Sequence, residues 1–202
     1  MRTVRLFVLF GLLAALAIGA ASAVTRPIVV HVNKAPLAWA DSRVQEELLG
    51  ELSRSPALTV VNTEDLGAQL PPLPRNEYDP EAWFDWGTEI GGRYLLVVDV
   101  KREVLERQKT FSIPIICQRW ETVGLIEGEL HLYDLQKRRL MTSESFSEKR
   151  SGSKQFQGST DDNRNDPSLH LTPSDKTALF RSLENDLARK LTKRVTQLTR
   201  GR

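Results

Sequence analysis

The sequence predicts an α/β fold of the α+β kind: a mixed sheet of about five strands that includes an antiparallel meander, with helices packed on it. An apolar run from Tyr94 to Val98 follows Gly91-Gly92 and lacks the alternation of a half-exposed strand. In the first half of the chain, segments with the hydrophobic pattern of a strand alternate with segments that have the pattern of a helix. In the second half, several strand-like segments follow one another. A leucine repeat of helical period closes the chain. The predicted order is β-α-β-α-β-β-β-α.

The amino-terminal segment has the pattern of a secretory signal peptide over residues 1–23. Arg2 and Arg5 precede an apolar run of residues 6–18, and Ala21-Ser22-Ala23 supplies a cleavage site. The run is shorter than the roughly 20 residues of a membrane-spanning helix, although an uncleaved anchor is the alternative. We therefore expect a single α/β domain over residues 24–202, with no integral membrane segment after cleavage.

Cleavage would leave a neutral chain. It removes two arginines and no acids, so the formal charge falls from +2 to zero (2 − 2). A neutral chain lacks the basic field of most nucleic-acid-binding proteins, and we expect no nucleic-acid partner. Cys117 is the single cysteine, so no internal disulfide is expected.

The first elements follow from periodicity and from residues that start or stop helices. Residues 26–32 are β-branched and apolar and predict a strand, and residues 58–61 predict a second. Between them, Asp41 is positioned to cap a helix that ends at about Ser53, before Pro56. The proline-rich residues 66–80 predict a loop.

A second helix is predicted after Asp79, which supplies a capping oxygen, with Pro80 in the first turn. Trp83, Trp86 and Ile90 share one face of this helix at helical spacing. Gly91 follows, where a left-handed conformation ends a helix.

The second half predicts strands and then a helix. Residues 94–100, the alternating stretch 111–117 and residues 126–133 and 140–146 have strand patterns, and Pro114 favours an edge position or a bulge. Residues 151–171 are polar and predict a mobile loop. Thr172 and Asp175 form a variant capping box. The leucines of this last helix need an apolar partner, so we expect it to cover the same sheet face as the helices before it.

Three passages resemble a known family of envelope proteins: "RYLLVVDVKREV", "VGLIEGELHLYDLQKRRLMTSESF" and "ALFRSLENDLARKLTKRV". The resemblance covers residues 26–198 and is to the family of the amino-terminal domain of periplasmic TolB. The curli-secretion-channel lipoprotein and the lipoprotein activators of penicillin-binding proteins share that fold. The turn after Asp134 lacks the usual glycine, and a lipid-acceptor cysteine is missing. The resemblance implies a non-enzymatic part of an envelope assembly.

Two groups are the candidate binding residues. Trp83, Phe84 and Trp86 could stack on a glycan or a partner side chain, or the two tryptophans could pack on the sheet and leave Phe84 exposed. Lys137, Arg138 and Arg139 form either a solvated turn or a contact for anionic lipid or glycan.

Catalytic and metal motifs are weak. Ser151 and Lys154 match S-x-x-K but fall in the predicted loop, without the partner motifs of penicillin-recognising enzymes. Residues 161–166 are rich in oxygen ligands but lack the glycine and glutamate of a calcium loop. His31, His131 and His170 are widely spaced. We therefore expect no enzymatic activity, no metal and no cofactor.

The sequence favours an exported binding or assembly module of a bacterial cell envelope. It would present a sheet edge, its Trp-bearing helix or the mobile loop to a protein partner. The expected location is periplasmic or secreted, with a peripheral position at the outer membrane left open. The alternative is a periplasmic protein that binds a glycan or small molecule through an aromatic surface. A hydrolase with an unrecognised site is a third reading.

Overall fold

The computed structural model describes residues 26–36, 39–76, 79–113, 117–157 and 171–200. The predicted signal peptide, Pro114, His170 and the acidic residues 161–166 lie outside these ranges. In chain order the elements are β1 (Arg26–Lys34), α2 (Val44–Ser53), β2 (Leu58–Asn62), the 3-10 segment η1 (Thr63–Gln69), α3 (Pro80–Glu89), β3 (Tyr94–Ile113), β4 (Cys117–Asp134), β5 (Arg139–Gln157) and α4 (Pro173–Arg200).

The sheet is mixed and has five strands in the order β2-β1-β3-β4-β5. β1 pairs in parallel with β2 and β3, whereas β3, β4 and β5 form an antiparallel meander. The predicted fold class and order of elements are therefore confirmed. The 3-10 segment η1 takes up the first part of the predicted loop of residues 66–80.

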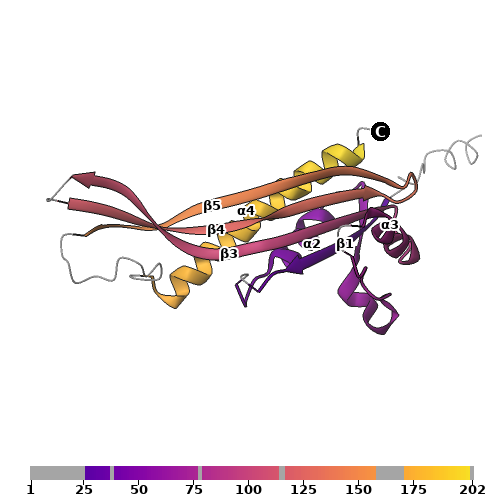
Figure 1. The fold of residues 1–202 in the computed structure, drawn as a ribbon, viewed down its shortest axis with the longest axis horizontal. Helices are drawn as coiled ribbons and strands as arrows, with labels where there is room; N and C mark the ends of the chain where they lie inside the picture. The colour runs from indigo at the N-terminus through magenta and orange to yellow at the C-terminus, as the bar shows by residue number, and fades with distance from the viewer. Residues whose placement is uncertain (1–25, 37–38, 77–78, 114–116, 158–170, 201–202) are drawn as a thin grey trace, which may run out of the picture.

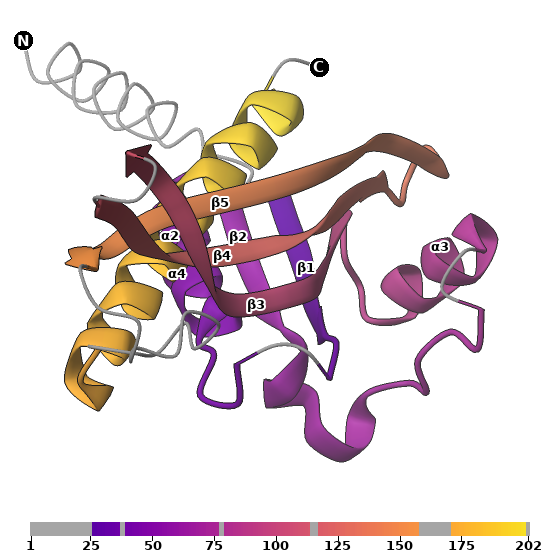
Figure 2. The same ribbon diagram turned by 60° about the vertical axis from the view of Figure 1, so that its left-hand side comes forward.

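The central position of β3 is also confirmed, because its apolar run is buried on both faces. Tyr94, Leu96 and Val98 face a core formed with α2 and α4. Leu95 and Val97 face a second core formed with α3. The expectation that α4 shares a sheet face with the helices before it is confirmed for α2. It is wrong for α3, which covers the opposite face. Figure 2 shows α3 apart from the other two helices.

The antiparallel strands are much longer than predicted. The β1 register on β3 ends at Val100, and β3 continues past a bulge between Val100 and Arg102 to Ile113. The meander thus extends beyond β1 and β2 (Figure 1). The predicted strand over residues 111–117 is wrong, because β3 ends at Ile113 and β4 begins at Cys117.

The predicted loop over residues 151–171 is also wrong in its first part, because β5 continues to Gln157. There the backbone pairs with β4, with Ser151 opposite Val123 and Gln157 opposite Gln118. Ladder hydrogen bonds to a long partner strand therefore hold a segment whose residues are mostly polar. Residues 158–170 lie outside the described chain.

Two of the three predicted helix starts are confirmed. Asp79 Oδ1 accepts a hydrogen bond from the Glu81 amide at 3.0 Å. Thr172 Oγ1 accepts one from the Asp175 amide at 3.1 Å. Gly91 has the predicted left-handed conformation, with φ of 85°.

The predicted cap at Asp41 is wrong. α2 begins at Val44, and its cap residue Arg43 makes no side-chain capping bond. Instead, the Arg43 amide donates to Glu184 Oε1 of α4 at 2.7 Å. A side chain distant in sequence therefore caps this helix, and α2 and α4 are joined by a polar contact as well as by their shared core.

Candidate functional site

The aromatic candidates lie in the core between α3 and the sheet. Trp83, Phe84 and Trp86 are 4%, 3% and 3% exposed. The two tryptophan rings contact each other edge to face, with centroids 5.6 Å apart, and the Phe84 ring meets the Tyr133 ring in the same way at 5.5 Å. The expectation that Phe84 is exposed is wrong, because α3 turns it towards β4.

The basic candidates lie in the turn between β4 and β5, where they have two different roles. Arg138 takes the left-handed conformation, with φ of 45°, at a turn where a glycine would be free of steric cost. Its guanidinium contacts Glu81 and lies 2.9 Å from Asp85, which ties the turn to α3. The hydrogen bonds that Arg138 donates to these two carboxylates raise its pKa.

The neighbouring cations are not held in this way. The side chains of Lys137 and Arg139 are exposed, and within the described chain they make no hydrogen bond or ion pair. Lys137 takes part in the turn through its backbone, whose amide donates to Asp134 Oδ1 at 3.0 Å. These two cations are therefore available to an external anion.

Sequence reasoning named a sheet edge as a possible contact but did not assign it to β5. Within the described residues this strand pairs only with β4, so one of its edges offers unpaired backbone groups over a strand of 19 residues. The odd-numbered side chains Ser143, Ser145, Ser147 and Lys149 are all exposed. The repeat S-x-S-x-S in the sequence was the available signal, because strict alternation of short polar residues is typical of an exposed strand face.

The opposite face of β5 is fixed to α4 by ion pairs. Arg194 Nε lies 3.0 Å from Glu144 Oε1, Lys190 pairs with Glu148, and Arg150 lies 2.6 Å from Asp186. The hydrogen bond from Arg194 lowers the pKa of Glu144. Single exposed pairs contribute little, but together they set the position of α4 along β5.

The other two edges of the sheet are less accessible to pairing. β2 is an edge strand of five residues. β3 has a free edge beyond Val100, but this part carries charged residues. Among them, Arg102 lies 2.8 Å from Glu106 and 3.1 Å from Glu127. Short length and charged side chains are both protections against edge-to-edge pairing.

A buried pair of acids lies between the sheet, α2 and α4. Glu103 on β3 is 2% exposed and Glu184 on α4 is 0% exposed. Glu184 is satisfied by the Arg43 amide and by Arg181 Nη1 at 2.9 Å. Burial raises the pKa of Glu103 to about 7, Glu184 adds to the shift, and the Ser42 hydroxyl and Lys34 oppose it.

The residues of the remaining sequence motifs are not arranged for catalysis in the described part of the chain. Ser151 and Lys154 lie on β5, and an extended strand separates residues i and i+3 that a helix would bring together. His131 is half-buried, and its Nε2 lies 3.7 Å from Asp99 Oδ2. In the described part of the chain, no group of three or more His, Cys, Asp or Glu side chains is placed to hold a metal ion.

No protein-family model matches the chain, and no curated protein matches it. Among solved structures, a Xanthomonas campestris protein of family DUF330 is 12% identical with a TM-score of 0.49, and the match covers 87% of this chain and 86% of that one. A minor lipoprotein from Acinetobacter baumannii is 12% identical with a TM-score of 0.44, over 86% and 94% of the two chains.

TolB from Acinetobacter baumannii is 15% identical with a TM-score of 0.35, and the match covers 60% of this chain and 23% of TolB. Because all three TM-scores lie below 0.5, these likenesses transfer no function to this chain. The resemblance to the TolB amino-terminal-domain family stays a prediction from the sequence pattern. Within the described residues, no helix is both long and apolar enough to cross a membrane.

Proposed function

We propose that this chain is an exported, non-enzymatic binding or assembly module of a bacterial cell envelope, and that it binds a protein partner along the free edge of β5. Export follows from the signal-peptide pattern of residues 1–23. The location is periplasmic or secreted. No cofactor takes part in this function.

The free edge of β5 carries the proposal. A partner strand that adds to it would gain main-chain hydrogen bonds along the edge, as in other cases of strand addition. The exposed side chains Ser143, Ser145 and Ser147 are short, so they leave room for a partner segment beside the strand. The ion pairs to α4 hold β5 in place before binding, which reduces the ordering cost of association.

One cation restricts this edge to specific partners. Lys149 is exposed near the middle of β5, on the same face as the serines, and a charged residue on an edge strand opposes indiscriminate pairing with other chains. The serine-lined portion before it is therefore the expected contact region.

A site-specific photo-crosslinking experiment tests the proposal. A photoreactive amino acid replaces Ser145 or Ser147 in the full chain, expressed with its own signal segment, and the cells are irradiated. We expect one adduct of defined mass from each of these positions. Ser174, an exposed serine in the first turn of α4, is the matched control and should give none.

Either of two results would argue against the β5 edge as the contact. One is the lack of any adduct from Ser145 and Ser147 while the protein is present at its normal level. The other is the same set of adducts from Ser174, which would indicate random collisions. Mass spectrometry of a specific adduct would identify the partner.

The alternative of a glycan-binding aromatic surface gains no support from the positions of its rings. Trp83, Phe84 and Trp86 are core side chains, so α3 would have to leave the sheet before any of them could stack on a sugar. We therefore do not place a glycan site on α3.

A further inference from the structure

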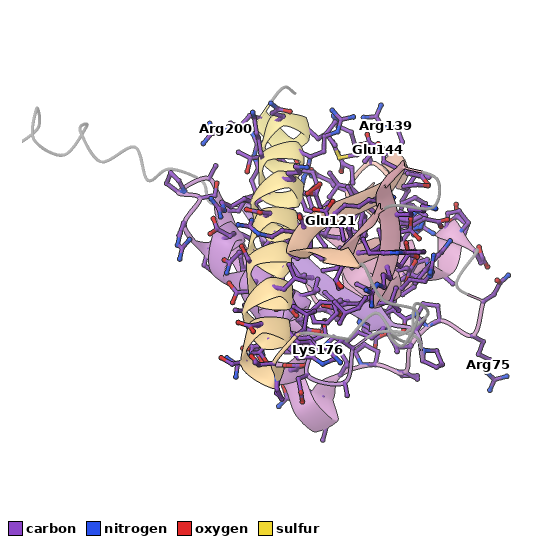
Figure 3. All side chains as sticks on the ribbon, turned by 90° about the vertical axis from the view of Figure 1, so that its left-hand side faces the viewer. Arg75, Glu121, Arg139, Glu144, Lys176 and Arg200 are labelled. Carbon is purple, nitrogen blue, oxygen red and sulfur yellow. The ribbon has the colours of Figure 1, made fainter. Side chains whose placement is uncertain are left out.

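One end of the molecule gathers cations from distant parts of the sequence. We call it the basic end and define it by Arg26, Arg93, Lys137, Arg139 and Arg200. It contains the start of β1, the start of β3, the turn between β4 and β5, and the end of α4. Figure 1 shows this turn and the end of α4 on the same side of the molecule, and in Figure 3 the labelled Arg139 and Arg200 both lie in the upper part of the view, on opposite sides of it.

Hydrogen bonds between these elements fix this arrangement. Arg26 Nη1 donates to the carbonyl of Thr199 in the last turn of α4, where a cation also meets the negative end of the helix dipole. The Arg93 amide donates to the Pro27 carbonyl at 2.8 Å, and the Arg93 carbonyl accepts from the Leu135 amide at 3.1 Å. The cations are therefore held on ordered elements.

Arg26 and Arg93 are each partly engaged, Arg26 by the Thr199 carbonyl and Arg93 by Asp134 at 3.6 Å. A guanidinium has five N–H donors, so both keep donors for a ligand. The other three cations have no such partner. Lys137, Arg139 and Arg200 are exposed, and none of them has a side-chain hydrogen bond or ion pair within the described residues. Glu89, at the end of α3, is an exposed acid on this side without a described ion pair.

A cleft of about 590 Å³ opens at the same end. Its size lies in the range of small-molecule sites. It combines apolar walls with two guanidinium groups, a donor type suited to phosphate. Its lining residues are Arg26, Pro27, Thr88, Gly91, Gly92, Arg93, Leu135 and Gln136.

We propose that the basic end docks on an anionic membrane surface, with a phosphate-bearing lipid headgroup in the cleft between Arg26 and Arg93. The free cations attract the protein to the anionic surface, and the cleft binds one headgroup.

Vesicle sedimentation tests the docking with the full chain. One set of vesicles contains phosphatidylcholine alone, and the other also contains phosphatidylglycerol. The readout is the ratio of the two affinities, because any binding that does not depend on the headgroup charge contributes equally in both sets. We expect a clear preference for the phosphatidylglycerol vesicles that weakens with added salt.

The double variant K137Q/R139Q should lose most of this preference. A basic residue near an anionic surface contributes about 1 kcal/mol, which is about five-fold in affinity, so two removed cations should weaken anionic binding by about 25-fold. The control R75Q/K149Q removes the same charge from exposed positions elsewhere, with Arg75 at the lower end in Figure 3. This control variant should keep at least half of the wild-type preference for the phosphatidylglycerol vesicles.

Three results would overturn the proposal. The first is equal binding to both vesicle types, and the second is an equal loss in the two double variants. The third comes from calorimetry with inorganic phosphate: binding as tight as that to the anionic vesicles would mean that a free anion, and not a membrane, is the ligand.

Discussion

In the folded protein the Glu103 carboxyl group keeps its proton up to a higher pH than it does in the unfolded chain. Its pKa is raised from an ordinary value of 4.5 to about 7, mainly because burial removes the carboxyl group from water. Between these two values the folded chain binds one proton more than the unfolded chain. The contribution of Glu103 to the free energy of unfolding should therefore fall as the pH rises from about 4.5 to about 7. Above that range this contribution should stay level.

Glutamine at position 103 should remove this dependence. It keeps a neutral group of the same shape beside Ser42 and Glu184, so E103Q should be more stable than the wild type at pH 8 and nearly equal to it at pH 5. The gain at pH 8 should be about 3 kcal/mol at most, the value of the whole pKa shift. Urea unfolding at the two pH values gives the comparison.

The control is E89Q, because Glu89 is exposed at the end of α3. This variant should keep the wild-type difference between pH 5 and pH 8. A wild-type protein that is equally stable at both pH values, or an E103Q variant that retains the full difference, would contradict the assignment to Glu103.

At the scale of elements, Gly128 permits the bulge at which β3 departs from its regular register. A Cβ at this position would lie 2.1 Å from the Asp99 carbonyl oxygen and 2.5 Å from the Phe146 ring. G128A should therefore destabilise the protein by about 1–3 kcal/mol or more, as overpacked substitutions do. Thermal unfolding of the purified variant measures the effect.

Gly50 is the matched control for this substitution. It lies inside α2, is exposed, and a Cβ there would meet nothing within 4 Å. Alanine is about 1 kcal/mol more favourable than glycine in a helix interior, so G50A should raise the melting temperature. A G128A variant as stable as the wild type would mean that the strands can shift to accept the methyl group.

The accuracy of the sequence predictions for each element depended on where its stabilising contacts come from. The starts of α3 and α4 were predictable because Asp79 and Thr172 cap the helices that directly follow them. The start of α2 was not, because its capping oxygen belongs to Glu184 on a different helix. The end of β5 was not predictable either, because backbone pairing with β4 requires no apolar side chains.

At the scale of the whole molecule, the sheet has a well-protected centre and a less protected extension. Between Tyr94 and Val100, β3 is flanked by β1 and β4, but beyond Val100 it pairs only with β4. Amide hydrogen exchange, read by mass spectrometry, should therefore be slowest in residues 94–98 and clearly faster in residues 104–109. Equal protection of both segments would mean that another part of the chain covers the free edge of β3.

The candidate sites show the limits of sequence reasoning at this scale. The unbroken apolar run at Tyr94–Val98 correctly predicted a strand covered on both faces, because burial on two sides removes the need for alternation. The burial of Phe84 could not be predicted, because it depends on the position of Tyr133 across the interface. The basic turn was recognised, but its grouping with Arg26 and Arg200 depends on the tertiary fold.

The length of β3 lets the molecule span a long distance. Twenty residues at a rise of about 3.3 Å correspond to a contour of roughly 66 Å. Tyr94 starts this strand beside the basic end, and Ile113 ends it at the far side of the meander (Figure 1). A chain bound to a lipid surface through Lys137 and Arg139 would carry the end of β3 and the start of β4 several nanometres outward. These strand ends could then contact a partner fixed to a second layer of the envelope.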